Sequence, residues 1–490
     1  MSGTVSAGRD QETLKNLIGG RWETAGVTEF DDVFNPATGE VIARVPLSGG
    51  EVVDRAVAEA AKAFAAWRDR PVYQRSQIMF RYKRLLEENK ERLACSITLE
   101  HGKLLAEARA EVERGIECVE LACGITMHLQ GRNLENVATN VDVEMYRQPL
   151  GVVAGICPYN FPAMIPLWMF PVAIACGNTF VLKPSERTPR TAVLLAQLLL
   201  EAGLPEGVFN IVHGSRQAAA RLLEHPEVRA ISFVGSQPVA AAIYREAAAH
   251  GKRVQALSGA KNHLIVLPDA DLDVTLEAVV GSAFGSTGQR CMAGSVLVAQ
   301  NRVADEFLEM LIERANNLKV GSGFDPETEM GPLIREQHRE RVKGYIAKGE
   351  QEGARLLFDG RRASVPPQGF FLGPTIFDQV HPDMTIAREE IFGPVLSTVR
   401  VETIEEAIDL VNRSEYGNGA VLFTQSGKAA RQFRRYANAG MIGINIGVPA
   451  PVAAFPFSGW KKSFYGSLHV NGLDGIEFYT EKKVVTSRWF

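Results

Sequence analysis

The fold of this chain is decided by the stretch GVVAGICPYNFPAMIPLWMFPVAIACGNTFVLKPS, residues 151–185. From Gly151 to Leu182 it carries no charged side chain, and an apolar run of that length is long enough to span a bilayer. The same run contains four prolines, and prolines at that density break a helix. We therefore expect a buried strand, a turn, a helix and a second buried strand, and no membrane span.

Strand-like and helix-like segments keep alternating after this stretch. The strand-like segments are TFVLKPS, VFNIVHG and RAISFVGS, and the helix-like segments are TAVLLAQLLLEAGLP and QPVAAAIYREAAAHG. This β/α alternation predicts a parallel, doubly wound, Rossmann-like sheet with right-handed crossovers. Ligands of such a sheet bind beyond the carboxyl ends of the strands, where Lys183, Gly235 and Ser236 fall.

The remainder of the chain divides into further parts. Residues 51–126 have apolar side chains at helical spacing, and residues 257–458 form a second block of alternating strands and helices. Residues 133–146 and the C-terminal GIEFYTEKKVVTSRWF (475–490) alternate like strands, and neither has a hairpin partner next to it in the sequence. We expect these two strands to pair with each other or with another subunit.

The length, charge and cysteines of the chain exclude several classes of protein. A chain of 490 residues is too long for one hydrophobic core, so two or three domains are expected. A net charge of −4 gives no basic field for nucleic acid or for an anionic membrane. The six cysteines form no CxxC pair and no zinc-ligand spacing, and the first twenty residues show no secretory or transit signal. We therefore expect a cytoplasmic protein without a metal site.

One cysteine stands out by its surroundings. Cys291 lies in GSAFGSTGQRCMAG (281–294), whose glycines make a tight and irregular backbone. A substrate can reach a cysteine on such a loop, and Arg290 beside it would favour the thiolate. The alternative is that Cys291 is a small buried apolar residue, as most cysteines are. The local sequence leaves both interpretations open.

Four other motifs carry polar groups that suit a carbonyl or a nucleotide. Asn160 in CPYNFP offers an amide donor for an oxyanion, although it also suits a turn. Lys183 in KPSE can bond a ribose or a phosphate, or can lie at the surface. Gly235 and Ser236 suit a pyrophosphate at a helix N-terminus, although FVGSQPVA is not a GxGxxG motif. Glu390 in REEIFGP can bind a ribose or belong to an exposed charge pair.

Taken together, these motifs resemble those of the aldehyde dehydrogenase superfamily. The resemblance covers nearly the whole chain and includes, in the family's order and spacing, FNPATGEVIARVP, CPYNFP, LKPSERTP, FVGS, GQRC, EEIFGP and GINIG. It implies an α/β fold with a Rossmann-like NAD domain (1–132 and 151–256), an α/β catalytic domain (257–458) and a small β oligomerisation element (133–150 and 459–490). It also implies a homo-oligomer, either a dimer or a tetramer.

The resemblance implies a role for each motif. Cys291 looks like the nucleophile that adds to the aldehyde, with the oxyanion held by the Asn160 amide and the Cys291 N–H. Hydride then passes to nicotinamide and leaves an acyl thioester on Cys291. The implied NAD groove is formed by Cys157, Tyr159, Lys183, Glu186, Arg187, Gly235, Ser236, Ser258, Glu390 and Phe392. Glu186 favours NAD over NADP, because a carboxylate repels a 2′-phosphate.

Three positions depart from the motifs of that family. Hydrolytic members carry a water-activating glutamate in an ELGGK motif, whereas this chain has LSGAK with Leu257 at that place. A glutamate of the late SGxGRE motif is replaced by Ser463, and Ala240 replaces a glycine after FVGS, which leaves the pyrophosphate geometry open. Leucine cannot act as a general base, so the thioester should resist water. Coenzyme A needs little base help, since a thiol with a pKa of about 8.5 is partly ionised at neutral pH.

The motifs ALSGAKNH, GQRCMA, NIGVPAP and FPFSGW are similar to those of CoA-acylating methylmalonate- and malonate-semialdehyde dehydrogenases. Those substrates carry a carboxylate, and the resemblance points to Arg114 and Arg290 as its partners. It also implies loss of CO₂, giving propionyl-CoA or acetyl-CoA. The alternatives are a hydrolytic aldehyde dehydrogenase whose base is supplied elsewhere and a non-catalytic protein on the same fold. A cysteine hydrolase lacks support, since no histidine motif accompanies Cys291.

Overall fold

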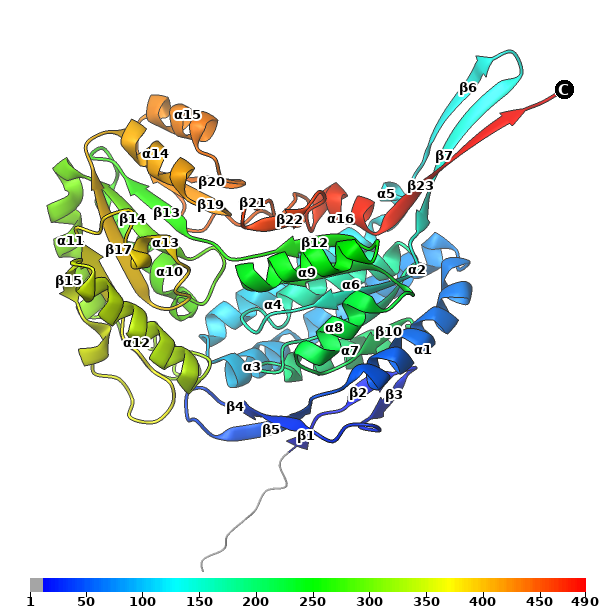
Figure 1. Ribbon diagram of the computed structural model, residues 1–490, viewed down its shortest axis with the longest axis horizontal. Helices are drawn as coiled ribbons and strands as arrows, with labels where there is room; N and C mark the ends of the chain where they lie inside the picture. The colour runs from blue at the N-terminus through cyan, green and yellow to red at the C-terminus, as the bar shows by residue number, and fades with distance from the viewer. Residues whose placement is uncertain (1–11) are drawn as a thin grey trace, which may run out of the picture.

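The computed structural model describes residues 12–490, and an eight-stranded sheet lies at its centre (Figure 1). The strand order is β22-β12-β11-β8-β9-β10-β2-β3, and the strands from β12 to β10 are all parallel. The strands are β2 (Asn16–Ile18), β3 (Arg21–Glu23), β8 (Val152–Ile156), β9 (Thr179–Lys183), β10 (Phe209–Ile211), β11 (Val228–Val234), β12 (Arg253–Leu257) and β22 (Phe464–Gly466). The prediction of a parallel sheet beginning at Gly151 is confirmed.

Helices cover both faces of this sheet, as the alternating pattern predicts. One core cluster joins it to α1 (Gly50–Arg68), α8 (Arg216–Glu224) and α9 (Gln237–Ala249). On the other face the core contains α2 (Val72–Glu88), α3 (Lys90–His101), α4 (Leu105–Cys123), α5 (Ile125–His128), α6 (Met164–Ala175) and α7 (Arg190–Glu201). α6 is the helix expected between two buried strands, and every side chain from Ile165 to Ala175 is buried.

A second sheet of seven strands carries the block after residue 257. Its order is β15-β16-β17-β14-β13-β19-β20, and only the pairing of β15 with β16 is antiparallel. The strands are β13 (Asn262–Val266), β14 (Gly294–Gln300), β15 (Arg355–Phe358), β16 (Thr375–Asp378), β17 (Val395–Val401), β19 (Gly419–Phe423) and β20 (Met441–Ile444). Its faces pack against α10 (Leu272–Phe284), α11 (Asn301–Asn316), α12 (Glu336–Gln351), α13 (Thr385–Arg388), α14 (Ile404–Arg413) and α15 (Gly427–Tyr436).

A three-stranded sheet projects from the body as an arm (Figure 1). It contains β6 (Arg132–Ala138), β7 (Val141–Pro149) and β23 (Thr480–Arg488), and β23 pairs with β7 in antiparallel register along its full length. The two partnerless segments of the sequence therefore pair with each other. The expectation of a single strand over 133–146 is wrong, because the backbone turns at Asn140, whose φ is 60°, and makes a hairpin.

The C-terminal part of the chain is more divided than expected. The strand expected over 475–490 begins only at Thr480, because Gly472–Phe478 form helix α16. Residues 459–490 also do not all join the arm, since β21 (Trp460–Lys461) pairs with β18 (Tyr416–Gly417) and β22 pairs with β12. The end of the chain thus connects the second block, the eight-stranded sheet and the arm.

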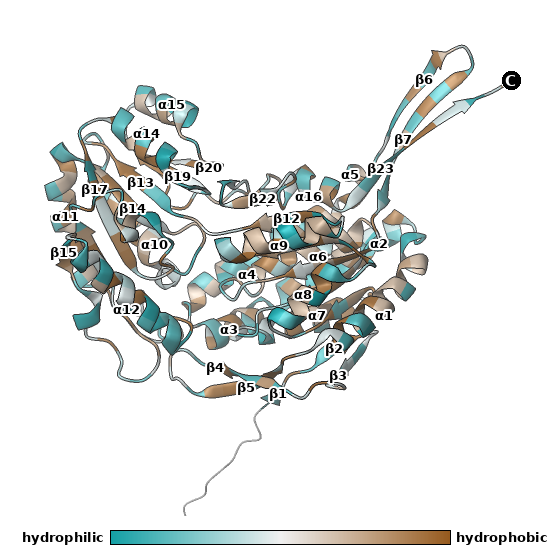
Figure 2. Ribbon diagram, viewed as in Figure 1, coloured by the Kyte–Doolittle hydropathy of each residue, from teal (hydrophilic) through white to brown (hydrophobic). Residues whose placement is uncertain are grey.

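The N-terminal region adds a small sheet of β1 (Glu12–Thr13), β4 (Phe30–Phe34) and β5 (Val41–Pro46). Residues 1–11, which belong to the first twenty residues for which no targeting signal is predicted, lie outside the described residues. Between residues 12 and 490, no helix combines the length and the apolarity that a membrane crossing requires. Apolar residues gather on the strands between the helices, whereas polar residues are plain on α12, α14 and α15 at the surface (Figure 2).

Candidate active site

Cys291 lies on a strained loop between α10 and β14. The loop begins with a 3-10 turn, Gly285–Gly288, in which Ser286 and Thr287 have φ angles of 47° and 56°. Non-glycine residues adopt such left-handed angles rarely and only where neighbours hold them. Here the Glu107 carboxylate accepts from the Ser286 N–H at 2.7 Å, and the Thr287 hydroxyl donates to a backbone carbonyl at 2.8 Å. The irregular loop expected from the glycines is confirmed.

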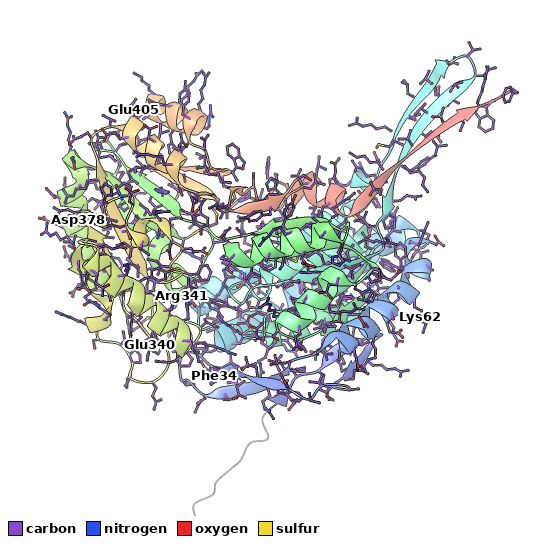
Figure 3. The ribbon with its side chains drawn as sticks, viewed as in Figure 1. Phe34, Lys62, Glu340, Arg341, Asp378 and Glu405 are labelled. Atoms are coloured by element: carbon purple, nitrogen blue, oxygen red, sulfur yellow. The ribbon has the colours of Figure 1, made fainter. Side chains whose placement is uncertain are left out.

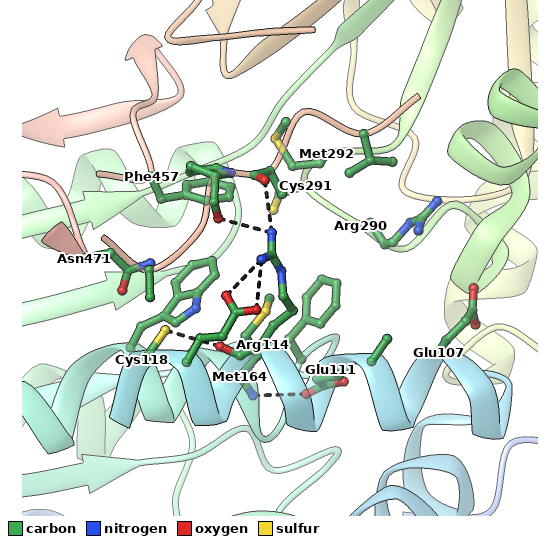
Figure 4. A pocket seen from close by; sticks show the side chains of 18 of the residues that line it. Glu107, Glu111, Arg114, Cys118, Met164, Arg290, Cys291, Met292, Phe457 and Asn471 are labelled. Carbon is green, nitrogen blue, oxygen red and sulfur yellow. Dashed lines mark hydrogen bonds and ion pairs between the residues drawn. The ribbon is translucent and has the colours of Figure 1, made fainter. Parts of the chain in front are cut away.

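Two cavities meet at Cys291. One has a volume of about 380 Å³ and contains Arg114 of α4 in its lining (Figure 4). The other has a volume of about 420 Å³ and contains Asn160 and Glu390. Within the described residues, Cys291 is the one residue that lines both cavities. A group bound in either cavity can therefore approach the sulfur atom.

The surroundings of Cys291 favour the protonated form of its thiol. Burial and, to a smaller extent, the carboxylate of Glu390 raise the pKa of this thiol to about 12. Arg290 and the backbone N–H groups of Cys291 and Met292 act in the opposite direction, but burial is the largest influence. Arg290 acts in the direction expected from the sequence, but desolvation outweighs the attraction of the guanidinium.

Asn160 is held at both its side chain and its backbone. Its Nδ2 donates to the Gln289 carbonyl at 3.0 Å, and its own carbonyl accepts from the Lys103 ammonium at 2.7 Å. The Gln289 side chain is fixed in turn, since its Oε1 accepts from the Tyr159 hydroxyl at 3.3 Å and from the Ile334 N–H at 3.1 Å. A side-chain amide has two N–H bonds, so one N–H of Asn160 remains for a ligand.

Two buried asparagines that the sequence analysis did not single out fix the backbone of Cys291. The Nδ2 atoms of Asn262 and Asn418 each donate to the Cys291 carbonyl at 2.9 Å. Asn262 also donates to the Ala293 carbonyl at 2.8 Å. No local motif could reveal these residues, because they lie 29 and 127 positions from Cys291 in the chain.

The second cavity collects most of the residues expected to bind NAD. Its lining includes Cys157, Tyr159, Glu186, Arg187, Gly235, Ser236, Ser258, Glu390 and Phe392. Lys183 lies behind this wall, where its ammonium is 3.5 Å from the Glu186 carboxylate and donates to the Pro184 carbonyl at 2.9 Å. His338 and Arg341 of α12 also line the cavity and were not expected. Arg341 lies where α12 faces the eight-stranded sheet (Figure 3).

Glu390 is a partly buried carboxyl group in the second cavity. Its Oε1 accepts from the Ala260 N–H at 2.9 Å, and burial raises its pKa to about 7. Burial also lowers the pKa of Lys261 to about 7, and its ammonium has no hydrogen-bond partner among the residues from 12 to 490. The exposed carboxylate of this motif belongs to the neighbouring residue, Glu389, which accepts from the Tyr345 hydroxyl at 2.7 Å.

The two arginines expected to bind a carboxylate have different orientations in the first cavity (Figure 4). Arg114 projects from α4 into the cavity, pairs with Glu117 at 2.9 Å, and donates to the carbonyls of residues 450 and 451 at 3.1 and 3.3 Å. The Arg290 guanidinium turns away and donates to two carbonyls near the end of α10. Of the two guanidinium groups, that of Arg114 is therefore the one directed into the first cavity.

The rest of the first cavity is mostly apolar. Its wall includes Phe161, Met164, Trp168 and Phe457, and the rings of Trp168 and Phe457 lie 5.0 Å apart. A short carbon chain fits between such side chains and the thiol, whereas a charged group is accommodated at Arg114. The cavity therefore suits a small substrate with one apolar and one anionic part.

Comparison with known proteins agrees with this geometry. The family model described as "Aldehyde dehydrogenase family" matches residues 22–485.

The chain belongs to the aldehyde dehydrogenase family.

Relatives of this aldehyde dehydrogenase include Malonate-semialdehyde dehydrogenase 2 of Geobacillus kaustophilus, 58% identical over 98% of this chain and 99% of the relative. Malonate-semialdehyde dehydrogenase of Halalkalibacterium halodurans is 57% identical with the same coverage. The crystal structure of methylmalonate-semialdehyde dehydrogenase from Oceanimonas doudoroffii is 50% identical, with a TM-score of 0.96 over 98% of this chain and 99% of that one. An NAD⁺ complex of an aldehyde dehydrogenase from Bacillus cereus is 34% identical, with a TM-score of 0.93 and 97% coverage of both chains.

The start of α9 in this aldehyde dehydrogenase fits the pyrophosphate of a dinucleotide. Gly235 and Ser236 precede the first turn of α9, and a helix N-terminus attracts anions. A Cβ atom at Gly235 would lie 2.4 Å from the Phe233 ring, so this position requires glycine. Ala240 is fully buried in the core between α9 and the sheet, so its methyl group does not obstruct the cavity. The residues present therefore fit NAD.

Neither position of the missing glutamates carries a base in this aldehyde dehydrogenase. Leu257 is 4% exposed and belongs to the core, and the Ser463 hydroxyl accepts from the Gly417 N–H at 3.1 Å. His338 is the one histidine in the two cavity linings, and its Nε2 is 2.7 Å from the Phe392 carbonyl. Burial lowers the pKa of His338 to about 4, and within residues 12–490 no hydrogen bond joins this histidine to Cys291 as in the cysteine–histidine pair of a hydrolase.

Proposed function

We propose that this aldehyde dehydrogenase oxidises malonate semialdehyde or methylmalonate semialdehyde, with NAD as the oxidant and coenzyme A as the acyl acceptor. The observation that carries the proposal is the position of Cys291 between two cavities, one with the Arg114 guanidinium and one that fits a dinucleotide. The relatives named malonate-semialdehyde and methylmalonate-semialdehyde dehydrogenase support the same substrate class.

In the first half of the proposed reaction, the Cys291 sulfur attacks the aldehyde carbon and the carbonyl oxygen becomes an oxyanion. The free N–H of Asn160 and the N–H of Cys291 are the donors that stabilise it. Because burial raises the pKa of the free thiol to about 12, the S–H proton passes to a water molecule in the cavity as the sulfur attacks the aldehyde carbon. Bound NAD supplies the hydride acceptor, and the acyl group stays on Cys291 as a thioester.

In the second half of the proposed reaction, the acyl group passes from Cys291 to another thiol. The substrate carboxylate leaves as CO₂, and its bonding electron pair moves toward the thioester carbonyl before a proton completes the α carbon. The thiolate of coenzyme A then attacks the acyl carbon, and the Cys291 sulfur leaves. Leu257 and Ser463 support thiol transfer over hydrolysis, because neither side chain can activate water.

Product analysis tests this proposal. With semialdehyde and NAD alone, we expect NADH to form to about one equivalent per active site, since the acyl group blocks Cys291. Addition of coenzyme A should restore turnover and give acetyl-CoA or propionyl-CoA with release of CO₂. Equal steady-state rates with and without coenzyme A would instead identify the enzyme as hydrolytic. Assays of both semialdehydes side by side would assign the methyl branch.

A non-catalytic role for the fold is the second alternative. Alkylation of Cys291 by iodoacetamide should abolish NADH formation with every aldehyde tested. Activity that survives complete labelling, as measured by mass spectrometry, would remove Cys291 from the mechanism.

We also propose a separate role for each of three parts of the fold. The eight-stranded sheet and its helices would bind the cofactor, the seven-stranded sheet would position Cys291, and the arm would join subunits into a dimer or tetramer. The register of the arm puts Val484 opposite Met145, and Leu134 opposite Val143, on one face. Leu134 and Val484 are 65% and 64% exposed, which supports this face as a contact between subunits.

A further inference from the structure

Lys103 and Glu111 form a buried ion pair in the wall of the first cavity. The Lys103 ammonium lies 2.7 Å from Glu111 Oε2, and neither side chain has any exposed surface. Among the ion pairs of residues 12–490, no other has both side chains fully buried. Two buried charges carry a desolvation penalty that their attraction alone seldom offsets, so such a pair needs further partners.

The further partners of this pair all belong to one short segment. The Lys103 ammonium donates to the Asn160 carbonyl at 2.7 Å and lies 4.1 Å from the centre of the Phe161 ring. Glu111 Oε1 accepts from the N–H groups of Ala163 and Met164 at 2.8 and 3.2 Å. The last of these bonds is visible beside α4 in Figure 4. The pair therefore holds both ends of the segment 160–164 against α4.

We propose that Lys103 and Glu111 are positioning residues that fix the oxyanion donor Asn160, an inference that rests on the role proposed for Asn160 above. The Asn160 side chain donates one N–H to the Gln289 carbonyl on the cysteine loop, at 3.0 Å. The Lys103 ammonium holds the backbone carbonyl of the same residue by donating a hydrogen bond to it. With both ends fixed, the second N–H keeps its direction without reorganisation when the oxyanion forms.

The helix that carries Glu111 also contacts the loop around the nucleophile. Glu107, one turn before Glu111 on α4, accepts from the Ser286 N–H in the cysteine loop at 2.7 Å. The same helix therefore holds the strained loop through Glu107 and the donor segment through Glu111. Arg114 continues this face of α4 into the cavity, as Figure 4 shows. α4 is thus the element against which the nucleophile, the oxyanion donor and the carboxylate partner are all aligned.

A double-mutant cycle tests the proposal. The pair is removed without leaving a lone charge by Lys103→Met with Glu111→Gln, in both the wild-type and the Asn160→Ala background. In the wild-type background we expect kcat/KM for the semialdehyde to fall about 10- to 100-fold, up to the loss seen when an oxyanion donor is removed. In the Asn160→Ala background the same change should alter kcat/KM by less than about threefold, because no donor remains to be positioned.

Additive losses in the two backgrounds would overturn the positioning role and leave a purely structural one. Full activity of the pair variant would overturn it as well. If Asn160→Ala alone left kcat/KM unchanged, the proposed oxyanion role would fall first and this inference with it. The three outcomes are distinguishable in one set of assays.

Two further measurements separate positioning from general damage. The rate of Cys291 alkylation by iodoacetamide needs no oxyanion donor, so the pair variant should keep it within about threefold of wild type. Lys90→Met with Glu113→Gln removes an ion pair between α3 and α4 whose side chains are 33% and 59% exposed, and it should leave kcat/KM unchanged. If the Met–Gln variant does not fold, Lys103→Gln with Glu111→Gln retains hydrogen-bonding groups at both positions and enters the same cycle.

Discussion

The Glu117 carboxylate already pairs with the Arg114 guanidinium in the first cavity. Its two carboxylate oxygens lie 3.2 and 2.9 Å from Arg114 Nη1. The residues are three positions apart on α4, so the helix itself brings them together. A substrate carboxylate must either displace Glu117 from Arg114 or share the guanidinium with it.

Glu117→Gln should therefore improve binding of carboxylated aldehydes. The two side chains are 33% and 38% exposed, and partly exposed ion pairs contribute only about 0.2–1 kcal/mol, so KM for malonate semialdehyde should fall by about two- to fivefold. The KM for propanal, which has no carboxylate, should not change. Glu113→Gln on the outer face of α4 is the matched control. A similar fall for both aldehydes would show that Glu117 does not compete with the substrate carboxylate.

Arg114→Leu should affect carboxylated substrates more strongly than Arg290→Leu. The Arg114 guanidinium enters the cavity, whereas Arg290 bonds backbone carbonyls near the end of α10. Loss of a charge-assisted bond of about 1.5–3 kcal/mol predicts a rise of at least tenfold in the ratio of KM for malonate semialdehyde to KM for propanal. Arg290→Leu should instead lower the thermal midpoint, because it removes the guanidinium donor from two carbonyls near the end of α10. The reverse ranking would assign the carboxylate to Arg290.

Leu257→Glu should increase hydrolysis of the acyl-enzyme. A glutamate at this position restores the group that hydrolytic relatives use to activate water. Without coenzyme A, we expect NADH formation to continue past one equivalent in the variant, with the free acid as product. Leu257→Gln, which has the same shape but no basic carboxylate, is the control. If the deacylation rate in water stays at the wild-type value, Leu257 does not explain a requirement for coenzyme A.

Glu390→Gln should make Cys291 more reactive above neutral pH. The pKa of Glu390 is raised to about 7, so its carboxylate is charged at pH 8.5, and this charge raises the pKa of the thiol. Removing it should increase the iodoacetamide rate at pH 8.5 by about two- to tenfold, as expected if the thiol pKa falls by up to about 1. At pH 6, where wild-type Glu390 is mostly protonated, the two rates should be similar. Glu389→Gln, at the exposed neighbour, should have the smaller effect at pH 8.5.

Val484→Lys should weaken association through the arm. Val484 lies on the face that also carries Leu134, Val143 and Met145. A lysine there places a charge in the proposed subunit contact, so the protein should elute at a smaller size in gel filtration with light scattering. Val485→Lys puts the same charge on the opposite face of the same strand. Equal effects of the two variants would show that the apolar face is not the contact.

The large features of this fold could be predicted because they repeat within the sequence. Buried strands alternate with helices after Gly151, and this pattern was sufficient to predict a parallel sheet. The hairpin of the arm was missed, because the turn at Asn140 depends on a single left-handed residue between two strand-like runs. The C-terminal segment was assigned to one element, although its short strands β21 and β22 are defined by partners far away in the chain.

The residues of the site also fall into two groups, those that a sequence motif reveals and those that only the fold brings together. Cys291 and Asn160 lie in recognisable motifs, and the structure places Cys291 between the two cavities and Asn160 in the wall of the second. Asn262, Asn418 and Lys103 act through backbone atoms of distant segments, and a single sequence contains no pattern that pairs them. The raised pKa of the Cys291 thiol could not be predicted from the sequence. The sequence shows Arg290 next to Cys291, but the burial that has the largest influence on this pKa arises only in the fold.

The bonds from Arg114 to residues 450 and 451 have a consequence for how the protein is made. These partners are separated by 336 and 337 positions in the chain. At about 5–20 residues per second, a ribosome needs about 20–70 s to travel that distance. Throughout that interval the nascent chain carries one wall of the cavity without the other, and Trp168 lacks the ring of Phe457 that lies 5.0 Å from it in the folded protein. Chaperones are therefore expected to bind this exposed apolar wall of the first cavity during synthesis.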